Sequence, residues 1–370
     1  MLYLANDQHH KQITVSLRDE EGHVLIRRQV STRPEKIREF LEQVRDLAGE
    51  EGFMATVEVC GFNDWFLALL KECGCREIVL VQPDKHSRRK TDRRDADSLG
   101  QLLWINRERI RRGERLQGIR RVMIPTRQDA EDRQLTATRQ RAGRERTRII
   151  NALRRILRKH NLTWAQPTKG FDTQAVRRWL QQIALPPIDR LETNQLLARW
   201  ELVDRQIAEL EESIAQRAAD REDVAILRTT KGLATYGALG LAARIGDVRR
   251  FPRPRSLANY FGLTPGCRNS GEHQDRLGSI TKQGSQFARF ILGQLVLHVL
   301  KHDPQMRAWY KRIKRRRGSK IARVAVMRRL CTVFWHMLTN QQPYMTGGPP
   351  RQRERRAPRT TRQPEPVAIG

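Results

Sequence analysis

The stretch Met54-Ala55-Thr56-Val57-Glu58-Val59 has the composition of a buried β-strand, and a single carboxylate interrupts it. Burying an ionised carboxylate without a partner costs several kcal/mol, so Glu58 has to be paired or bound. One of the many arginines of the chain could satisfy it in a salt bridge. A metal ion shared with other acids would satisfy it equally well, and further acids in the sequence favour this second interpretation.

The segments around this strand follow the order of a ribonuclease-H-like domain. Residues 1–30 show the alternating pattern of β-strands, and the first strand ends at Asp7. A helix capped by Thr32 is expected next, and helices then alternate with apolar strands as far as Gln82. A strand hairpin followed by alternating helices and strands predicts a mixed α/β domain whose strand ends meet at one edge.

Lys90-Thr91-Asp92-Arg93-Arg94-Asp95-Ala96 begins the next predicted helix. Aspartates three residues apart share one face of a helix, where their carboxylates can hold one cation. Taken alone, such a pair is typical of an exposed helix start with local ion pairs. Together with Asp7 and Glu58, it predicts a two-metal site for phosphoryl transfer, with Mg²⁺ or Mn²⁺ as the cofactor.

The charge balance indicates a polyanionic partner. Lys and Arg number 71 against 41 Asp and Glu, a formal net charge of +30, and an excess of this size favours nucleic acid. The sequence shows no long apolar stretch, lipidation signal or signal peptide, so no membrane partner is expected. The five cysteines lack a C-x-x-C motif and are interpreted as reduced thiols, which predicts a cytoplasmic protein.

Two long helices are predicted in the middle of the chain. Residues 126–160 form a very basic one with few acids nearby, which favours contact with a nucleic-acid backbone. The arginines expected to bind nucleic acid, one of them from the earlier helix, are Arg93, Arg139, Arg144, Arg148 and Arg155. After Pro186-Pro187, apolar residues from Leu196 to Ile214 alternate spacings of four and three, the seam of a short coiled coil. Its partner is either the basic helix in cis or another subunit, and the second arrangement predicts a homo-oligomer, a dimer or tetramer.

Ser270 stands in the routine turn Asn269-Ser270-Gly271, where a lone serine normally has no catalytic role. Its cationic neighbours change this interpretation, because Arg268, Arg276 and Lys282 lie close in sequence. A hydroxyl nucleophile that attacks DNA needs such support for the charge that develops on phosphorus. Three nearby glycines would let a phosphate approach the backbone: Gly271, Gly278 and Gly284.

Several of these motifs occur together in one known family, and those of the second half occur in the family's order and at its spacing. In the first half they are Asp7, Val57-Glu58-Val59-Cys60-Gly61 and the stretch from Lys90 to Ala96. In the second half they are Ile245-Gly246-Asp247, Leu257–Pro265, Asn269-Ser270-Gly271 and Ile280–Gly284. On these motifs the chain resembles the DEDD-class insertion-sequence transposases of the "IS one-ten" family, which act as bridge-RNA-guided recombinases.

The resemblance implies a RuvC-like domain in which Asp7, Glu58, Asp92 and Asp95 are the metal ligands. It implies that Ser270 is the nucleophile, which cuts a DNA strand, holds it as a covalent phosphoserine and passes it to a new hydroxyl. The implied partners are double-stranded DNA at donor and target sites, a guide RNA (the bridge RNA) that pairs with both, and further copies of the chain in a tetramer. The implied location is the bacterial cytoplasm, in association with the nucleoid.

The sequence therefore predicts an α/β plus α fold with four parts. They are a ribonuclease-H/RuvC-like DEDD catalytic domain at 1–125, a basic helix and coiled-coil region at 126–222, a mainly helical transposase domain with the nucleophilic serine at 223–342, and a disordered basic tail at 343–370. Within the third part, Lys311–Arg317 is expected to be a basic bridge between two helices. Two other functions stay open: a metal-dependent ribonuclease-H-like nuclease or Holliday-junction resolvase without a covalent intermediate, and a nucleic-acid-binding protein without activity.

Overall fold

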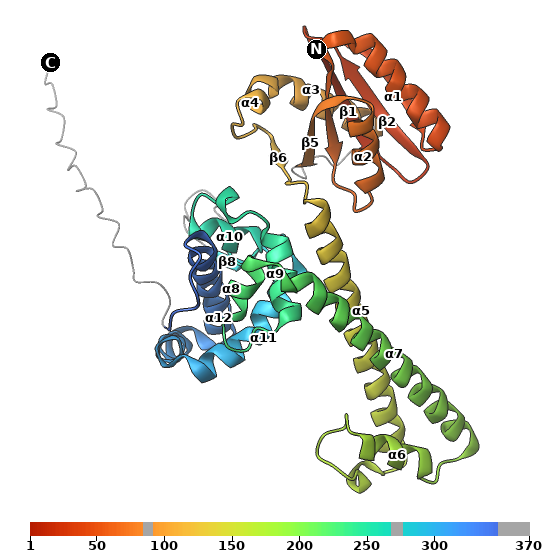
Figure 1. Ribbon diagram of the computed structural model, residues 1–370, viewed down its shortest axis with the longest axis vertical. Helices are drawn as coiled ribbons and strands as arrows, with labels where there is room; N and C mark the ends of the chain where they lie inside the picture. Colours follow the sequence, from red (N-terminus) through yellow and green to blue (C-terminus); the bar gives the residue numbers. More distant parts are fainter. Residues whose placement is uncertain (84–91, 268–276, 347–370) are drawn as a thin grey trace, which may run out of the picture. The chain divides into compact units, whose positions relative to one another are not determined.

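The computed structural model describes residues 1–83, 92–267 and 277–346. The chain divides into two compact units, Met1–Ile124 and Pro125–Gly370. The first unit holds the main β-sheet and the second is mainly helical (Figure 1), so the predicted mixed α/β class is confirmed. The division into four domains stays a prediction. Among the described residues, no helix is both long enough and apolar enough to span a bilayer.

A six-stranded sheet forms the centre of the first unit. Its strands are β1 (Leu2–Gln8), β2 (Gln12–Arg18), β3 (Val24–Ser31), β4 (Phe53–Glu58), β5 (Cys75–Pro83) and β6 (Ile119–Arg121). They lie in the order β3-β2-β1-β4-β5-β6. The first three pair antiparallel, β1, β4 and β5 run parallel, and β6 joins β5 antiparallel. The carboxyl ends of β1 and β4 therefore lie at the same edge of the sheet.

Helices cover both faces of this sheet. They are α1 (Pro34–Ala48), α2 (Asp64–Glu72), α3 (Asp92–Ile105) and the short α4 (Arg107–Arg111), with a single 3-10 turn, η1 (Gly49–Glu51). Because side chains alternate across a strand, Leu2 and Leu4 of β1 pack with α1 and α2, whereas Tyr3 and Ala5 pack with α3. Asp7 continues the second series, so the alternation assigns it to the face that α3 covers.

The start of α1 differs from the prediction. Arg33 precedes the helix, and no side chain caps its amino end. The Thr32 hydroxyl instead donates a hydrogen bond to the carbonyl of His10, 3.0 Å away. Pro34 occupies the first helical position and has no N–H to satisfy, so the helix begins without the predicted cap.

Two long helices begin the second unit. They are α5 (Arg127–Lys159) and α7 (Pro187–Ala219), with η2 (Thr163–Ala165) and α6 (Gln174–Gln182) between them. Figure 1 shows α5 and α7 side by side. Three ion pairs join the two helices: Arg155–Glu192, Arg139–Glu211 and Asp132–Arg217. In this order the α5 residue number decreases while the α7 residue number increases. The two helices are therefore antiparallel.

The predicted apolar seam of α7 packs on α5 of the same chain. Leu196, Trp200 and Val203 are buried in one cluster with Leu153 and Ile156 of α5. Of the two partners that the sequence allowed for this seam, the structure therefore contains the one in cis.

The remaining helices of the second unit share one hydrophobic core, to which α9 contributes. The elements of this part are α8 (Glu222–Arg228), α9 (Thr235–Ile245), η3 (Val248–Arg250), α10 (Pro254–Tyr260), β7 (Pro265–Cys267), β8 (Leu277–Ile280), α11 (Gln286–His302) and α12 (Pro304–Thr339). From Gly237 to Ile245 every residue of α9 is buried. Lys311–Arg317 was predicted as a bridge between helices, and this is wrong, because these residues are themselves helical. Helix geometry is interrupted directly after them at Gly318 (φ 79°, ψ 167°), so α12 consists of two helical segments joined at a kink, and the positive φ favours glycine.

Candidate active site

Asp7 and Glu58 lie side by side on the neighbouring parallel strands β1 and β4, at the end of the sheet where both strands have their carboxyl ends; this end is called the carboxyl edge below. β1 and β4 pair with Asn6 opposite Val57, so the next residues along the two strands are Asp7 and Glu58. Glu58 lies four residues after Met54 on β4, so both side chains are on the same face, and Met54 packs against α3. Both acidic residues are half-buried. The two carboxylates therefore share an edge and a face of the sheet.

The amino end of α3 extends toward the same edge. Near the other end of the helix, Trp104 packs on Gly22 in the β2–β3 turn, which lies at the end of the sheet opposite the two acids. Gly100 lies against Ala5 in the middle of β1. The first turn of α3, with the half-buried Asp95, therefore extends toward the carboxyl edge.

The structure thus brings three of the four predicted acids, Asp7, Glu58 and Asp95, to one region. Asp92 is the first residue of α3. Its side chain and that of Arg93 lie outside the described residues. The roles of all four acids stay predictions.

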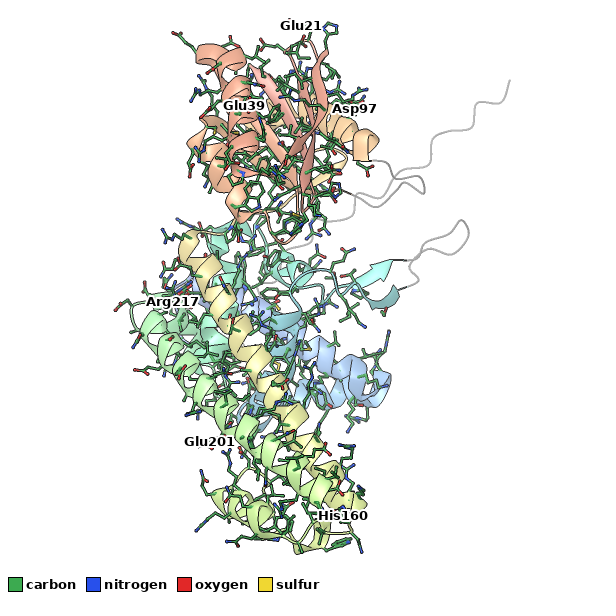
Figure 2. All side chains as sticks on the ribbon, turned by 90° about the vertical axis from the view of Figure 1, so that its right-hand side faces the viewer. Glu21, Glu39, Asp97, His160, Glu201 and Arg217 are labelled. Atoms are coloured by element: carbon green, nitrogen blue, oxygen red, sulfur yellow. The ribbon has the colours of Figure 1, made fainter. Side chains whose placement is uncertain are left out.

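Asp97 fixes α3 on the sheet, and sequence reasoning missed it. Its Oδ1 accepts hydrogen bonds from Arg18 at 2.8 Å and from Ser16 at 3.3 Å, and its Oδ2 pairs with Arg27 at 2.9 Å. These partners come from β2 and β3, so one carboxylate attaches the helix to two strands. Figure 2 labels Asp97. The sequence shows only that an aspartate lies two residues after Asp95, and the sequence does not reveal which arginines this aspartate pairs with.

A second network holds the turn that follows Glu58. The Asn63 side-chain nitrogen donates to Oε1 of Gln8 and to the Glu58 carbonyl, both at 2.9 Å, and its Oδ1 accepts from the Cys60 N–H at 2.9 Å. Gln8 Nε2 donates in turn to the Phe62 carbonyl at 3.2 Å. Asn63 and Gln8 are buried. The ends of β1 and β4 and the turn between β4 and α2 are therefore one hydrogen-bonded unit.

The residues at this edge fit a divalent cation by their donor chemistry, because carboxylate oxygens are the ligands that Mg²⁺ prefers. The Asp7 side chain is 13% exposed, and its Oδ2 lies 3.2 Å from His9 Nε2. Within the described ranges, the only three metal-ligating groups whose atoms lie within 4.8 Å of one another are Asp19, Glu21 and His23. They belong to the turn at the opposite end of the sheet, where Asp19 accepts from the His23 backbone N–H at 2.7 Å, so turn formation accounts for their proximity.

The stretch with Ser270, Arg268 and Arg276 connects β7 to β8 in the sequence and lies outside the described residues. Lys282 follows β8; it is exposed, and its N–H donates to the Gly262 carbonyl at 3.1 Å.

Gly284 was interpreted as a point where phosphate approaches the backbone, and the structure gives another reason for glycine at this position. A Cβ at Gly284 would lie 2.0 Å from the Tyr260 carbonyl oxygen, so the close approach of two backbone segments requires glycine there.

The expected scarcity of acids around α5 is also wrong, because α7 supplies them. Arg139 pairs with Glu211, and Arg155 pairs with Glu192. Arg148 lies 3.5 Å from a third acid, Glu145 of its own helix. Three of the arginines predicted to bind nucleic acid therefore already have acidic partners.

A groove of about 840 Å³ lies between α5 and α7 on the second unit. Arg141, Arg144 and Arg148 line its α5 side, and all three are exposed. Val203 and Leu210 of α7 contribute apolar surface. A groove with a row of exposed guanidinium groups suits a phosphate backbone, and binding there stays a prediction.

Two family models match the chain. Residues 4–162 match a model of the DEDD transposases of IS110 type, described as "Transposase", and residues 224–311 match one described as "Transposase IS116/IS110/IS902 family". The "Transposase for insertion sequence element IS1111A" of Coxiella burnetii is 26% identical over 337 residues, 89% of this chain and 87% of that protein. The "Probable family 20 transposase" of Pseudomonas aeruginosa is 23% identical over 336 residues, 89% of this chain and 94% of that protein.

The first match spans Asp7, Glu58, Asp92 and Asp95, and the second spans Ser270. A DEDD-type domain indicates the use of divalent metal ions, and membership of a transposase family implies a recombinase that cuts DNA. The two family models match separate parts of the chain, and both describe transposases, as do the names of both relatives. The chain belongs to the IS110 family of DEDD transposases.

Proposed function

We propose that the chain cuts and exchanges the DNA strands of an insertion sequence with two groups of residues, the acids Asp7, Glu58, Asp92 and Asp95 and the hydroxyl of Ser270. The observation that carries the proposal is the parallel pairing of β1 and β4, with Asp7 and Glu58 adjacent on the face under α3. The strand order β3-β2-β1-β4-β5 supports a RuvC-like domain.

The four carboxylates would hold Mg²⁺ or Mn²⁺, which supplies positive charge to the reacting phosphate when bound. Asp97 and Asn63 act as positioning residues in this proposal. Asp97 holds the helix that carries Asp95, and Asn63 holds the turn after Glu58. Neither side chain needs to touch the DNA.

Ser270 supplies the attacking atom. Its oxygen forms a bond to phosphorus while the bond from phosphorus to the leaving DNA oxygen breaks, and the proton that serine loses balances the one that the leaving oxygen gains. The phosphoserine ester then passes its strand to another DNA hydroxyl by the same exchange in reverse. Arg268, Arg276 and Lys282 would stabilise the negative charge during each exchange.

The proposed partners are double-stranded donor and target DNA, a guide RNA and further copies of the chain. The net charge of +30 and the groove with Arg141 and Arg144 support binding to phosphate backbones. Sequencing the RNA that co-purifies with the full chain tests the guide. A single structured species encoded beside the gene is expected, and heterogeneous cellular RNA would contradict the proposal.

A trapping experiment tests the chemistry. The full chain is incubated with labelled DNA from the ends of its insertion sequence and Mg²⁺, then denatured and separated by electrophoresis. A labelled protein–DNA adduct is expected for the wild type and for Asp46→Asn, a control whose side chain is 71% exposed. Ser270→Ala and Asp95→Asn should form none. An adduct with Ser270→Ala would overturn the nucleophile, and cutting without any adduct would favour a resolvase.

A further inference from the structure

Three apolar side chains are exposed directly after the strand that ends in Glu58. Val59 is 41% exposed, Phe62 is 45% exposed and Trp65, in the first turn of α2, is 40% exposed. Scattered exposed apolar residues are ordinary on protein surfaces. Two large aromatic side chains three residues apart, directly after the strand that ends in Glu58, are a more specific arrangement, and their position suggests a role at the candidate site.

Hydrogen bonds fix the backbone of this turn to the strand ends. The Phe62 carbonyl accepts from Gln8, the neighbour of Asp7, and Asn63 donates to the Glu58 carbonyl. Gly61 has a φ of 79°, which permits the sharp turn between them. The segment that carries Phe62 is therefore held in place relative to the strands that carry the two acids.

We propose that Phe62 and Trp65 form a stacking surface for an unpaired nucleobase of the DNA strand that enters the carboxyl edge of the sheet. The inference rests on the proposed function, because a DNA strand bound at the acids lies at the carboxyl ends of β1 and β4, and the turn that carries Phe62 starts from the end of β4. Aromatic faces stack on any base, so such a surface needs no particular sequence. The β1–β2 turn at the same edge carries the exposed Lys11, whose charge suits the backbone of that strand.

The site should therefore prefer DNA that is locally opened to DNA that is fully paired. Stacking captures a base only after it has left the duplex, and the contact offsets part of the cost of unpairing. A hydrophobic protein partner would use the same side chains differently, because it needs apolar volume and no flat ring.

Binding of oligothymidine to the full chain in the presence of Mg²⁺, followed by fluorescence anisotropy, tests the proposal. Phe62→Leu and Trp65→Leu keep apolar volume and remove the aromatic face. Each should weaken binding by about tenfold, the size expected when one base loses its stacking partner. Phe62→Tyr should bind as the wild type does. Trp164→Leu is the matched control, because Trp164 is 90% exposed in the second unit and should leave the affinity unchanged.

The same variants are measured with a fully paired duplex, with oligouridine and by mass photometry. Unchanged duplex affinity and an unchanged oligomeric state are expected. Unchanged oligothymidine affinity in both leucine variants overturns the inference, as does a loss confined to RNA or a change in oligomeric state. Asp95→Asn should still bind oligothymidine, so failure of the catalytic proposal and failure of the stacking surface give different results.

Discussion

Two basic stretches of the second unit, α5 and residues 311–320 of α12, look alike in sequence and differ in their surroundings. Along α5, acids of α7 meet Arg139, Arg146 and Arg155. In the α12 stretch the cations are all exposed, and no ion pair joins them to an acid of the described chain: Lys311, Arg312, Lys314, Arg315, Arg316, Arg317 and Lys320.

The difference separates cations that hold the fold from cations that are available to a partner. Each exposed ion pair along α5 contributes at most about 1 kcal/mol, yet it occupies its arginine. Cations without acidic partners are available to neutralise DNA phosphates, and each neutralised phosphate releases counterions that were condensed on the DNA. We therefore expect the α12 stretch to contribute more to DNA affinity than the paired arginines of α5.

The largest effect is expected where the pairing is buried. Asp132 of α5 is fully buried and accepts from Arg217 and, at 2.7 Å, from Arg221. Asp132→Ala leaves both guanidinium groups without this acceptor, so the free energy of unfolding should fall by about 3–5 kcal/mol. Urea denaturation measures the change. Asp46→Ala, at an exposed acid, should change it by less than about 0.5 kcal/mol. A similar small change for Asp132→Ala would contradict the distinction between buried and exposed pairs.

An intermediate effect is expected on DNA affinity. Replacing Arg315, Arg316 and Arg317 with glutamine should reduce the slope of log K against log salt by about 0.9 for each DNA phosphate that the variant no longer neutralises. Arg139→Gln should leave the slope unchanged, because Glu211 already occupies that guanidinium. Titrations of a short duplex at several salt concentrations check both variants. An equal decrease in slope for the two variants would show that arginines of α5 bind DNA even though they pair with acids of α7.

Patterns within one segment were readable from the sequence. The period of apolar residues predicted α5 and α7, and the alternation of strands and helices predicted the edge where Asp7 and Glu58 lie. The strand β6, with only three residues, escaped because it is too short to show a period. Relations between distant segments were not readable.

Several of the differences between prediction and structure share that cause. Glu211 lies far along the chain from Arg139, and only the folding of α7 onto α5 brings them together. Asp97 acts through arginines on two strands, which the sequence does not pair with it. At Gly284, a glycine that a neighbouring backbone requires looks the same in sequence as one that a ligand requires.

The smallest effect is expected at the far end of the α5–α7 pair, where acid should break the pairing. Lys159 Nζ and His160 Nε2 each lie 2.8 Å from Asp189 Oδ2. Hydrogen bonds from Lys159 and then from His160 hold the pKa of Asp189 below its ordinary value of 3.8. A carboxyl group with a lowered pKa stabilises the fold above its ordinary pKa, and this stability is lost as the pH falls through the lowered value.

Asp189→Asn should therefore lower the urea midpoint at neutral pH, by less than Asp132→Ala does. The difference from the wild type should shrink as the pH falls below about 4, since both chains then lack the charge. Glu212→Gln, at an exposed acid of the same helix, should show no such convergence. A constant difference in urea midpoint at every pH would mean that Asp189 stabilises the fold through its shape and not through its charge. The ion pairs of α5 would then hold the fold less than their geometry indicates, and the contrast with the unpaired cations of α12 would be smaller.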